Sequence, residues 1–255
     1  MNLFCRCIIA YSMKRRLDLI LSEKNYFNSR SKAQVHILAG EVYVNGQKEC
    51  VPSKLVDLES VIEIKYLSEN FVSRGGQKLV AALNHFKINV KNKTCMDIGA
   101  STGGFSDCLL RFGAKKIYTV DVGYGQLDYK LRNNSKIVNI ENTNARYITT
   151  STIDDFVDII VMDVSFISIT KFDSFFEIFT AANNEYVGLI KPQFELGKSK
   201  LGKHGIVKDS SDRIRAVEQV SNFLKTFYNS VSDAIESPIK GSKGNTEYLI
   251  YCKNI

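Results

Sequence analysis

The chain has 255 residues, of which 44% are hydrophobic and 24% are charged, and it contains only 3 prolines. This composition excludes a disordered chain and fits either one large domain or a small domain joined to a larger one. The net charge of +7 favours an anionic partner such as RNA, DNA or an anionic membrane surface.

The amino-terminal residues do not follow the order of an export signal. An apolar stretch comes first and the positive cluster Lys14 to Arg16 follows it, whereas a secretory signal places its positive charges before the apolar stretch. We expect residues 1–12 to be an extension and Met13 to be the natural start.

The cysteines and histidines predict neither a metal site nor a disulfide framework. The 6 cysteines include no CxxC pair, and the 3 histidines are far apart in the sequence. Zinc and iron–sulfur sites need closer spacing, so we expect no metal and reduced thiols in a cytoplasmic protein. No apolar run approaches the length of a membrane-spanning helix, which is about 18 residues, so we expect no stable membrane association.

A small first domain is predicted for residues 13–66. Leu17, Ile20 and Leu21 have helical spacing, and a second helix is expected between Ser29 and Gly40. The sequence VYVNGQ predicts a strand that enters an Asn-Gly hairpin turn, and VIEIKY predicts a further strand. A core of this size suits an appended module better than an enzyme.

Basic side chains gather at the starts of both predicted helices. The local net charge of residues 14–54 is +4. Such a cluster can face nucleic-acid phosphates, although a solvated helix face has the same composition. The cluster comprises Lys14, Arg15, Arg16, Arg30 and Lys32.

A linker is predicted for residues 67–75 and a second domain for residues 76–255. After a helix over residues 76–86, apolar strands alternate with helices, which indicates strands that are buried on both faces. We therefore predict an α/β fold with a doubly wound, mostly parallel Rossmann-like sheet, preceded by the small α+β domain. Strands are expected over residues 94–99, 116–122, 136–140, 157–164, 186–191, 231–239 and 246–252, with a long helix over 209–228.

A glycine-rich turn, DIGASTGGF, follows the first of these strands. Glycine lets the backbone approach a ligand above the strand ends, and Asp121, at the end of the next strand, can accept the hydroxyl groups of a ribose. The two features fit a nicotinamide dinucleotide or S-adenosylmethionine. The spacing G-x-x-x-G-G departs from the dinucleotide pattern and favours S-adenosylmethionine. Asp97 is expected to hold the amino end of that cofactor or to cap the turn.

Charged residues occupy the ends of several predicted elements. Asp163 ends the fourth strand, Lys191 ends the fifth, Glu247 opens the last, and Lys78 follows an Arg-Gly-Gly sequence. Each residue alone is typical of a solvated or structural charge. Together, four charges at one edge of a sheet can form a reaction site.

The first domain resembles a small RNA-binding domain that was first described in a ribosomal small-subunit protein and also occurs in pseudouridine synthases. The likeness rests on RLDLILSEKNYFNSRSKAQVHILAGEVYVNGQ, with its leucine-rich helix, Ser-Arg pair, second helix and VYVNG. It implies that the helix pair contacts structured RNA through Arg15, Arg30 and Lys32.

Roughly residues 14–252 resemble the TlyA, or haemolysin A, family of ribosomal RNA ribose 2′-O-methyltransferases, which belongs with the FtsJ-like methyltransferases. Six motifs carry the likeness in order: SRGGQKL, DIGASTGGF, VDVGYGQL, MDVSFIS, KPQFE and GNTEYL. The resemblance implies a methyltransferase sheet and a catalytic tetrad of Lys78, Asp163, Lys191 and Glu247. The S-adenosylmethionine contacts that it implies are Gly99, Ala100, Ser101, Thr102, Gly103, Gly104, Phe105, Asp121 and Asn144, in addition to Asp97, which is expected from its place at the end of the first strand.

The chemistry of methyl transfer agrees with this implication. A ribose hydroxyl must lose its proton as it attacks, so a base is needed, whereas the sulfonium donor is already activated and needs no metal. A lysine can act as a base when burial or nearby positive charge lowers its pKa. We expect Lys191 to be that base and Lys78 to hold the 2′-oxygen or a neighbouring phosphate, with the two carboxylates orienting the lysines.

A basic segment follows the proposed base. Residues 191–215 have a net charge of +4 and are predicted to form mainly a loop beside the site. Such a loop can clamp an RNA backbone. The candidate RNA contacts outside the first domain are Arg74, Lys198, Lys200 and Lys203.

These patterns favour a cytoplasmic enzyme that methylates a ribose 2′-hydroxyl, with cytidine as the implied nucleoside, in ribosomal RNA or ribosomal subunits and not in DNA. A membrane-active haemolysin is an alternative that needs an amphipathic or spanning segment, and none stands out. A non-catalytic RNA-binding or ribosome-assembly factor is another alternative. A nicotinamide dehydrogenase is the weakest one because of the glycine spacing.

Overall fold

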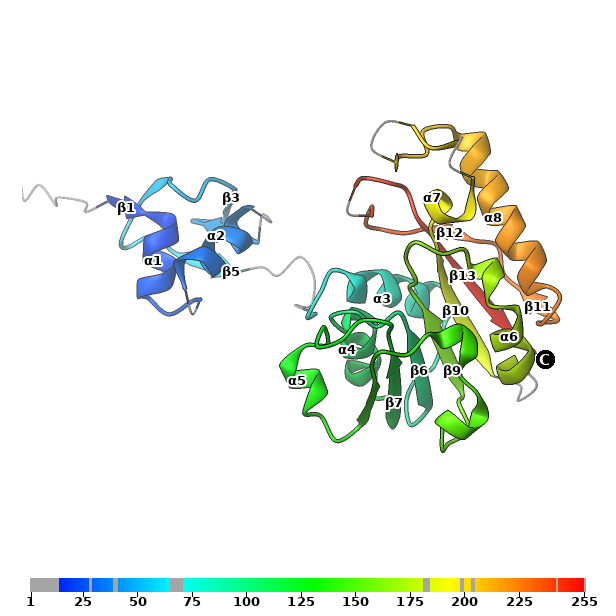
Figure 1. The fold of residues 1–255 in the computed structure, drawn as a ribbon. Coiled ribbons are helices and arrows are strands. Elements are labelled where there is room, and N and C mark those ends of the chain that lie inside the picture. The colour runs from blue at the N-terminus through cyan, green and yellow to red at the C-terminus, as the bar shows by residue number, and fades with distance from the viewer. Residues whose placement is uncertain are drawn as a thin grey trace, which may run out of the picture. The chain divides into compact units, whose positions relative to one another are not determined.

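The computed structural model describes residues 14–27, 29–38, 41–64, 71–180, 184–197, 200–202, 205–241 and 243–254, without the side chains of residues 31, 32, 35 and 38. The chain divides into two compact units, Met1–Asn70 and Phe71–Ile255, which are described one at a time (Figure 1). The predicted extension of residues 1–12 and the proposed start at Met13 lie outside the described residues.

The first unit contains two helices and two small antiparallel sheets. The predicted hairpin is confirmed: β2 (Val42–Val44) pairs with β3 (Gln47–Glu49), and the turn residues Asn45 and Gly46 have φ values of 50° and 79°. Left-handed φ values favour asparagine and glycine, which explains the Asn-Gly pair. The other elements are β1 (Lys14–Arg16), α1 (Leu17–Glu23), α2 (Arg30–Leu38), β4 (Leu55–Asp57) and β5 (Ile62–Ile64).

One pairing in this unit was not predicted from the sequence. Strand β1 pairs with β4, and its last residue leads directly into α1, whereas β5 pairs with β2 as a third strand beside the hairpin. The apolar stripe expected for the first helix is confirmed, since Leu17, Ile20 and Leu21 are all buried. They pack with Ala33 and Ile37 of α2 in one small core.

Asp18 is the buried polar centre of the first unit. Its carboxylate accepts hydrogen bonds from Arg16 at 3.0 and 2.9 Å, from Arg30 at 3.0 Å and from Gln34 at 2.7 Å. The side chain is fully buried, and these bonds, led by that from Arg16, hold the pKa of Asp18 well below its usual value. The carboxylate therefore joins the start of α1 to α2.

We expect Asp18→Ala to lower the free energy of unfolding of the first unit by about 2 kcal/mol, because it removes a charged acceptor from three donors. A carboxylate with a lowered pKa stabilises the folded state above its unfolded pKa of about 4 and loses that effect as the pH falls below it. Urea titrations of the full chain at neutral and acidic pH measure both effects. A variant as stable as the wild type at neutral pH contradicts this role.

The second unit is an eight-stranded sheet with helices on both faces (Figure 1). Its strand order is β11-β13-β10-β9-β6-β7-β8, and β12 also pairs with β13. Strands β6 to β10 are parallel and β13 is antiparallel to β10, which confirms the predicted doubly wound, mostly parallel sheet. The strands are β6 (Thr94–Ile98), β7 (Lys116–Val120), β8 (Ile137–Ile140), β9 (Ile159–Met162), β10 (Glu185–Ile190), β11 (Ser230–Val231), β12 (Ile235–Glu236) and β13 (Tyr248–Lys253).

The strands are apolar along their length because alternate residues are buried under different helices. Cys95 and Val161 belong to the core formed with α3 (Gly75–His85) and α4 (Gly104–Arg111), whereas Met96 and Met162 belong to the core formed with α6 (Asp173–Thr180) and α8 (Ser210–Leu224). The shorter elements are α5 (Tyr129–Arg132), α7 (Pro192–Glu195), η1 (Ala145–Tyr147), η2 (Thr150–Thr152) and η3 (Ile169–Lys171).

Two segments differ from the sequence prediction. The loop predicted over residues 191–215 begins instead with the helical turn α7, because Pro192 suits the first position of a helix, where no N–H is needed. Its last residues belong to α8, which confirms the start of the helix predicted over residues 209–228; the helix ends earlier, at Leu224. The strand predicted over residues 231–239 is two short strands, β11 and β12, both paired with β13.

Candidate active site

The sheet brings the predicted charged residues to one edge. Asp121, Asp163 and Lys191 directly follow the parallel strands β7, β9 and β10, so they lie at the carboxyl ends of those strands. Glu247 directly precedes β13, which is antiparallel, and the pairing of Ile190 with Tyr248 places that start at the same edge. In open α/β sheets this edge is where ligands bind.

The four residues of the predicted tetrad form two ion pairs. Lys78 Nζ, in the first turn of α3, donates to Glu247 Oε2 at 2.6 Å. Lys191 Nζ lies 2.5 Å from Asp163 Oδ1. The side chains of Lys78 and Lys191 are only 11% and 9% exposed, so burial of each ammonium group depends on its carboxylate partner.

Both ion pairs line one pocket of about 510 Å³. The glycine-rich turn forms another part of its wall, through Gly99, Ala100, Ser101, Thr102, Gly104 and Phe105, and Arg74 and Asp97 also line it. The sequence placed these residues on separate segments, and the structure brings them together around a single cavity. Gly103, which was also predicted to contact the cofactor, is not part of the lining; its φ of 95° shapes the turn before α4.

Lys191 has a second polar partner that the sequence did not single out. Its Nζ donates to Ser165 Oγ at 2.7 Å, in addition to its ion pair with Asp163. A neutral lysine amine has two N–H donors and one lone pair. Lys191 lies against Asp163 and Ser165 in the pocket wall, so as a neutral amine it can present its lone pair to a group in the pocket.

The glycine turn approaches the neighbouring strand end closely. Gly99 has a φ of 79°, and a Cβ added there would lie 2.7 Å from the carbonyl oxygen of Asp163. Only glycine allows this contact. Asp121 fixes the far side of the turn, because its carboxylate accepts the backbone N–H of Ser101 at 2.8 Å and that of Gly123 at 2.7 Å.

A second pocket of about 380 Å³ adjoins the first. Asp121 and Asn144 line it, and Gly99, Ser101 and Asp163 line both pockets. Asn144 precedes η1 and accepts the backbone N–H of Arg146 at 3.2 Å. The acid predicted for a ribose and the amide predicted for an adenine therefore share one cavity beside the reaction pocket.

Asp97 is a fully buried carboxylate in the wall of the larger pocket. Its Oδ2 accepts the hydroxyl of Ser106 at 2.6 Å, whereas its Oδ1 has no hydrogen-bond partner among the described residues. Burial raises the pKa of Asp97 to about 7. An unpartnered carboxylate oxygen of this kind fits a cationic ligand group such as an ammonium.

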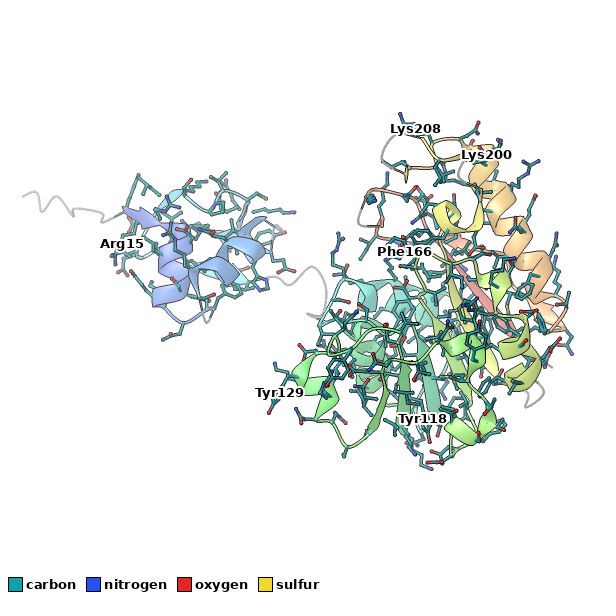
Figure 2. The ribbon with its side chains drawn as sticks, in the orientation of Figure 1. Arg15, Tyr118, Tyr129, Phe166, Lys200 and Lys208 are labelled. Atoms are coloured by element: carbon teal, nitrogen blue, oxygen red, sulfur yellow. The ribbon has the colours of Figure 1, made fainter. Side chains whose placement is uncertain are left out.

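Phe166 and Glu195 were quoted in motifs but not selected from the sequence. Phe166 has a φ of 66°, is 89% exposed, and lines both pockets (Figure 2). Glu195, at the end of α7, is buried and accepts the hydroxyl of Ser168 and the backbone N–H of Ile169. It thereby holds the loop after β9 against the turn that follows Lys191. The positive φ of Phe166 cannot be predicted from a sequence pattern.

The predicted RNA contacts have varied surroundings. Arg15 pairs with Glu23 at 2.7 Å, Arg30 bonds Asp18, and Lys200 pairs with Asp212 of α8 at 3.1 Å; Arg15 and Lys200 are marked in Figure 2. All three side chains are close to half exposed. Lys198, Lys203 and the side chain of Lys32 lie outside the described residues.

Neither a metal-binding cluster nor a membrane-spanning helix is found among the described residues. No group of three or more His, Cys, Asp or Glu in the described part of the chain can hold a metal ion. None of the helices within the described ranges is both long enough and apolar enough to cross a membrane.

Comparisons with known proteins match both units. Residues 71–254 match the FtsJ-like methyltransferase family, and residues 15–62 match the S4 domain. The chain is 47% identical to Hemolysin A of Brachyspira hyodysenteriae, over 92% of this chain and 98% of that protein. It is 38% identical to the 16S/23S rRNA (cytidine-2′-O)-methyltransferase TlyA of Mycobacterium tuberculosis, over 94% of this chain and 90% of that protein.

Solved structures agree with these matches. A protein from Streptococcus thermophilus described as a hemolysin superposes with a TM-score of 0.70 and 34% identity, over 95% of this chain and 89% of that chain. A Listeria monocytogenes protein described as an S-adenosylmethionine-dependent methyltransferase has a TM-score of 0.53 at 15% identity, covering 72% of this chain and 100% of that one. The second likeness supports the fold alone.

Proposed function

The chain belongs to the TlyA, or haemolysin A, family of FtsJ-like methyltransferases, and we propose that it transfers a methyl group from S-adenosylmethionine to a cytidine ribose 2′-hydroxyl of ribosomal RNA. The observation that carries this proposal is the pair of lysine–carboxylate contacts, Lys78–Glu247 and Lys191–Asp163, in one pocket beside the glycine turn. The S4 domain supplies the unit that would bind the RNA.

The two adjoining pockets fit S-adenosylmethionine in a defined direction. In the smaller pocket, Asp121 would accept the ribose hydroxyls and Asn144 would contact the adenine. In the larger one, the unpartnered oxygen of Asp97 would bind the α-ammonium group, and Gly99, which lines both pockets, would lie beside the part of the cofactor that joins the two ends. When bound, the cofactor supplies a methyl group that is activated by its sulfonium sulfur.

Lys191 would act as the general base. Asp163 and Ser165 hold its amine beside the pocket, so in the neutral form its lone pair would accept the proton of the 2′-hydroxyl as the 2′-oxygen takes the methyl group. The cofactor would supply that methyl group, with its sulfur as the leaving group. Glu195 would keep the loop carrying Ser165 in register with Lys191, because it bonds the backbone of that loop.

Two further groups would place the nucleotide. Lys78 is fixed by Glu247 through one N–H and has others left to hold the 2′-oxygen. Phe166 presents an exposed ring that borders both pockets, and unpaired RNA bases stack on such aromatic faces. The ribose of a base stacked there would lie at the mouth of the pocket that holds the two lysines.

We expect the affinity for S-adenosylmethionine to rise with pH and to level off above about 7. The carboxyl of Asp97 has a raised pKa of about 7 and must be ionised to pair with an ammonium group, so each unit below that value lowers the affinity by up to about tenfold. Calorimetric titrations from about pH 5.5 to 8.5 measure this dependence. Asp97→Asn should bind weakly with no such dependence, whereas a flat wild-type profile contradicts the assignment.

The proposed function is tested with the purified full-length chain, radiolabelled S-adenosylmethionine and ribosomal RNA or subunits from cells that lack the gene. We expect label in RNA as 2′-O-methylcytidine after nuclease digestion, and none in DNA. Ribosomal RNA is in the cytoplasm, so we propose that the enzyme acts there. Cofactor binding without transfer to any ribosomal RNA would instead favour a non-catalytic ribosome-assembly factor.

A further inference from the structure

The loop between β12 and β13 forms one rim of the reaction pocket. Its residues Ile239, Lys240, Gly241, Lys243 and Asn245 line the cavity together with Glu247. The backbone of the loop is closed by hydrogen bonds from Ser237 N to Glu247 O at 2.8 Å and from Gly241 N to Asn245 O at 2.9 Å.

Buried Asn245 ties this loop to the segment before α8. Its Oδ1 accepts the N–H of Val207 at 2.9 Å, and its Nδ2 donates to the carbonyl of Gly205 at 3.0 Å. The asparagine side chain therefore positions the loop through both its oxygen and its nitrogen. The two lysines that precede it in the loop, Lys240 and Lys243, are exposed instead.

Three cations on the pocket wall have no partner among the described residues. Arg74, Lys240 and Lys243 are exposed, and none of them makes an ion pair or a side-chain hydrogen bond within the described ranges. The tetrad charges neutralise each other in pairs, and Asp97 is buried deeper in the wall. The rim thus carries a surplus of positive charge, which predicts an anionic ligand group at the mouth of the pocket.

We propose that Lys240 and Lys243, with Arg74, bind the backbone phosphate next to the target ribose. This inference rests on the proposed function, because a ribose 2′-oxygen and its 3′-phosphate are attached to adjacent carbons. A phosphate held at this rim would therefore bring the 2′-oxygen to the lysines at the base of the pocket. Lysine and arginine are the usual partners of RNA phosphates.

Gly241 couples this phosphate site to the tetrad. A Cβ at Gly241 would overlap the carboxylate of Glu247, so a glycine at this position lets the loop lie against the Lys78–Glu247 pair. Gly241→Ala should displace either the Glu247 carboxylate or the loop, and we expect it to lower the turnover number as well as the affinity for RNA. The lysine substitutions should act mainly on RNA.

The test compares Lys240→Ala/Lys243→Ala with Lys115→Ala in the full-length chain. Lys115 is an exposed lysine that precedes β7, at the opposite edge of the sheet, so its loss shows the effect of removing one positive charge away from the pocket. The affinity for a short single-stranded RNA is measured against salt concentration. Each neutralised phosphate contributes about 0.7 to the slope of the logarithmic plot, so we expect the double variant, which loses one phosphate contact, to lose about 0.7.

Kinetics with ribosomal RNA transcribed in vitro and calorimetry with S-adenosylmethionine complete the test. We expect the double variant to raise the Michaelis constant for RNA by about tenfold and to keep wild-type affinity for the cofactor. A salt slope equal to that of Lys115→Ala overturns the proposal, as does a loss of cofactor affinity, which would assign the lysines to the cofactor carboxylate. The salt slope needs no methyl transfer, so an inactive wild-type protein would reject the proposed function separately.

Discussion

Replacing Lys191 with alanine should abolish measurable methyl transfer and leave cofactor binding intact. General base catalysis contributes about a hundredfold to ten-thousandfold, so the turnover number should fall by at least about a hundredfold. Lys191 touches neither Asp121 nor Asn144 in the smaller pocket, so the affinity for S-adenosylmethionine should stay close to that of the wild type. Single-turnover transfer of labelled methyl groups and calorimetry measure the two quantities.

Two further variants keep this result interpretable. Lys191→Met retains the apolar stem and removes only the amine, which controls for loss of packing. Lys93→Ala removes the lysine of another ion pair, with Glu185 at 2.5 Å, at the opposite edge of the sheet, and it should retain activity. Methylation of RNA by both Lys191 variants at the wild-type rate would exclude Lys191 as the base.

Replacing Asp121 with alanine should instead act on the cofactor. Hydrogen bonds to a charged group contribute about 1.5 to 3 kcal/mol, so the affinity for S-adenosylmethionine should fall by about ten- to a hundredfold. Part of the loss comes from the turn itself, because the Asp121 carboxylate also holds the N–H of Ser101. At saturating cofactor the turnover number should recover, since Asp121 does not line the reaction pocket.

Asp128→Ala is the matched control for this second variant. Asp128 caps α5 by accepting the N–H of Lys130 at 2.8 Å and lines neither pocket. Its loss should cost helix-capping stability of about 1 kcal/mol and no cofactor affinity. Equal affinities for S-adenosylmethionine in Asp121→Ala and the wild type, by calorimetry, would remove Asp121 from the cofactor site.

The sequence predicted the fold well because its patterns are local. The Asn-Gly turn, the helical spacing around Leu17 and the uniformly apolar strands each reflect one element and its immediate neighbours. Strand pairings between segments that are far apart in the sequence were harder to predict. The strand β1 lies in a basic run with no alternation, and its pairing with β4 depends on a segment about 40 residues away.

The sequence could place the charged residues at strand ends but could not pair them. Lys78 bonds Glu247, 169 positions later, because β13 is antiparallel and lies beside β10. No local sequence pattern indicates this placement of β13. Ser165 and Phe166 were inside a quoted motif, yet their roles depend on the direction of one short loop. Lys240 and Lys243 were not selected from the sequence, because only the fold places the loop between β12 and β13 on the pocket wall.

The most direct test of the central claim is a map of ribose methylation in ribosomal RNA. RNA is compared from cells with the gene, without it, and complemented with the wild-type gene or Lys191→Ala. Protection of a cytidine linkage from alkaline cleavage identifies each 2′-O-methyl group. We expect at least one such cytidine to depend on the gene, to return with the wild type and to stay unmethylated with Lys191→Ala. Identical maps from all four strains would contradict the account.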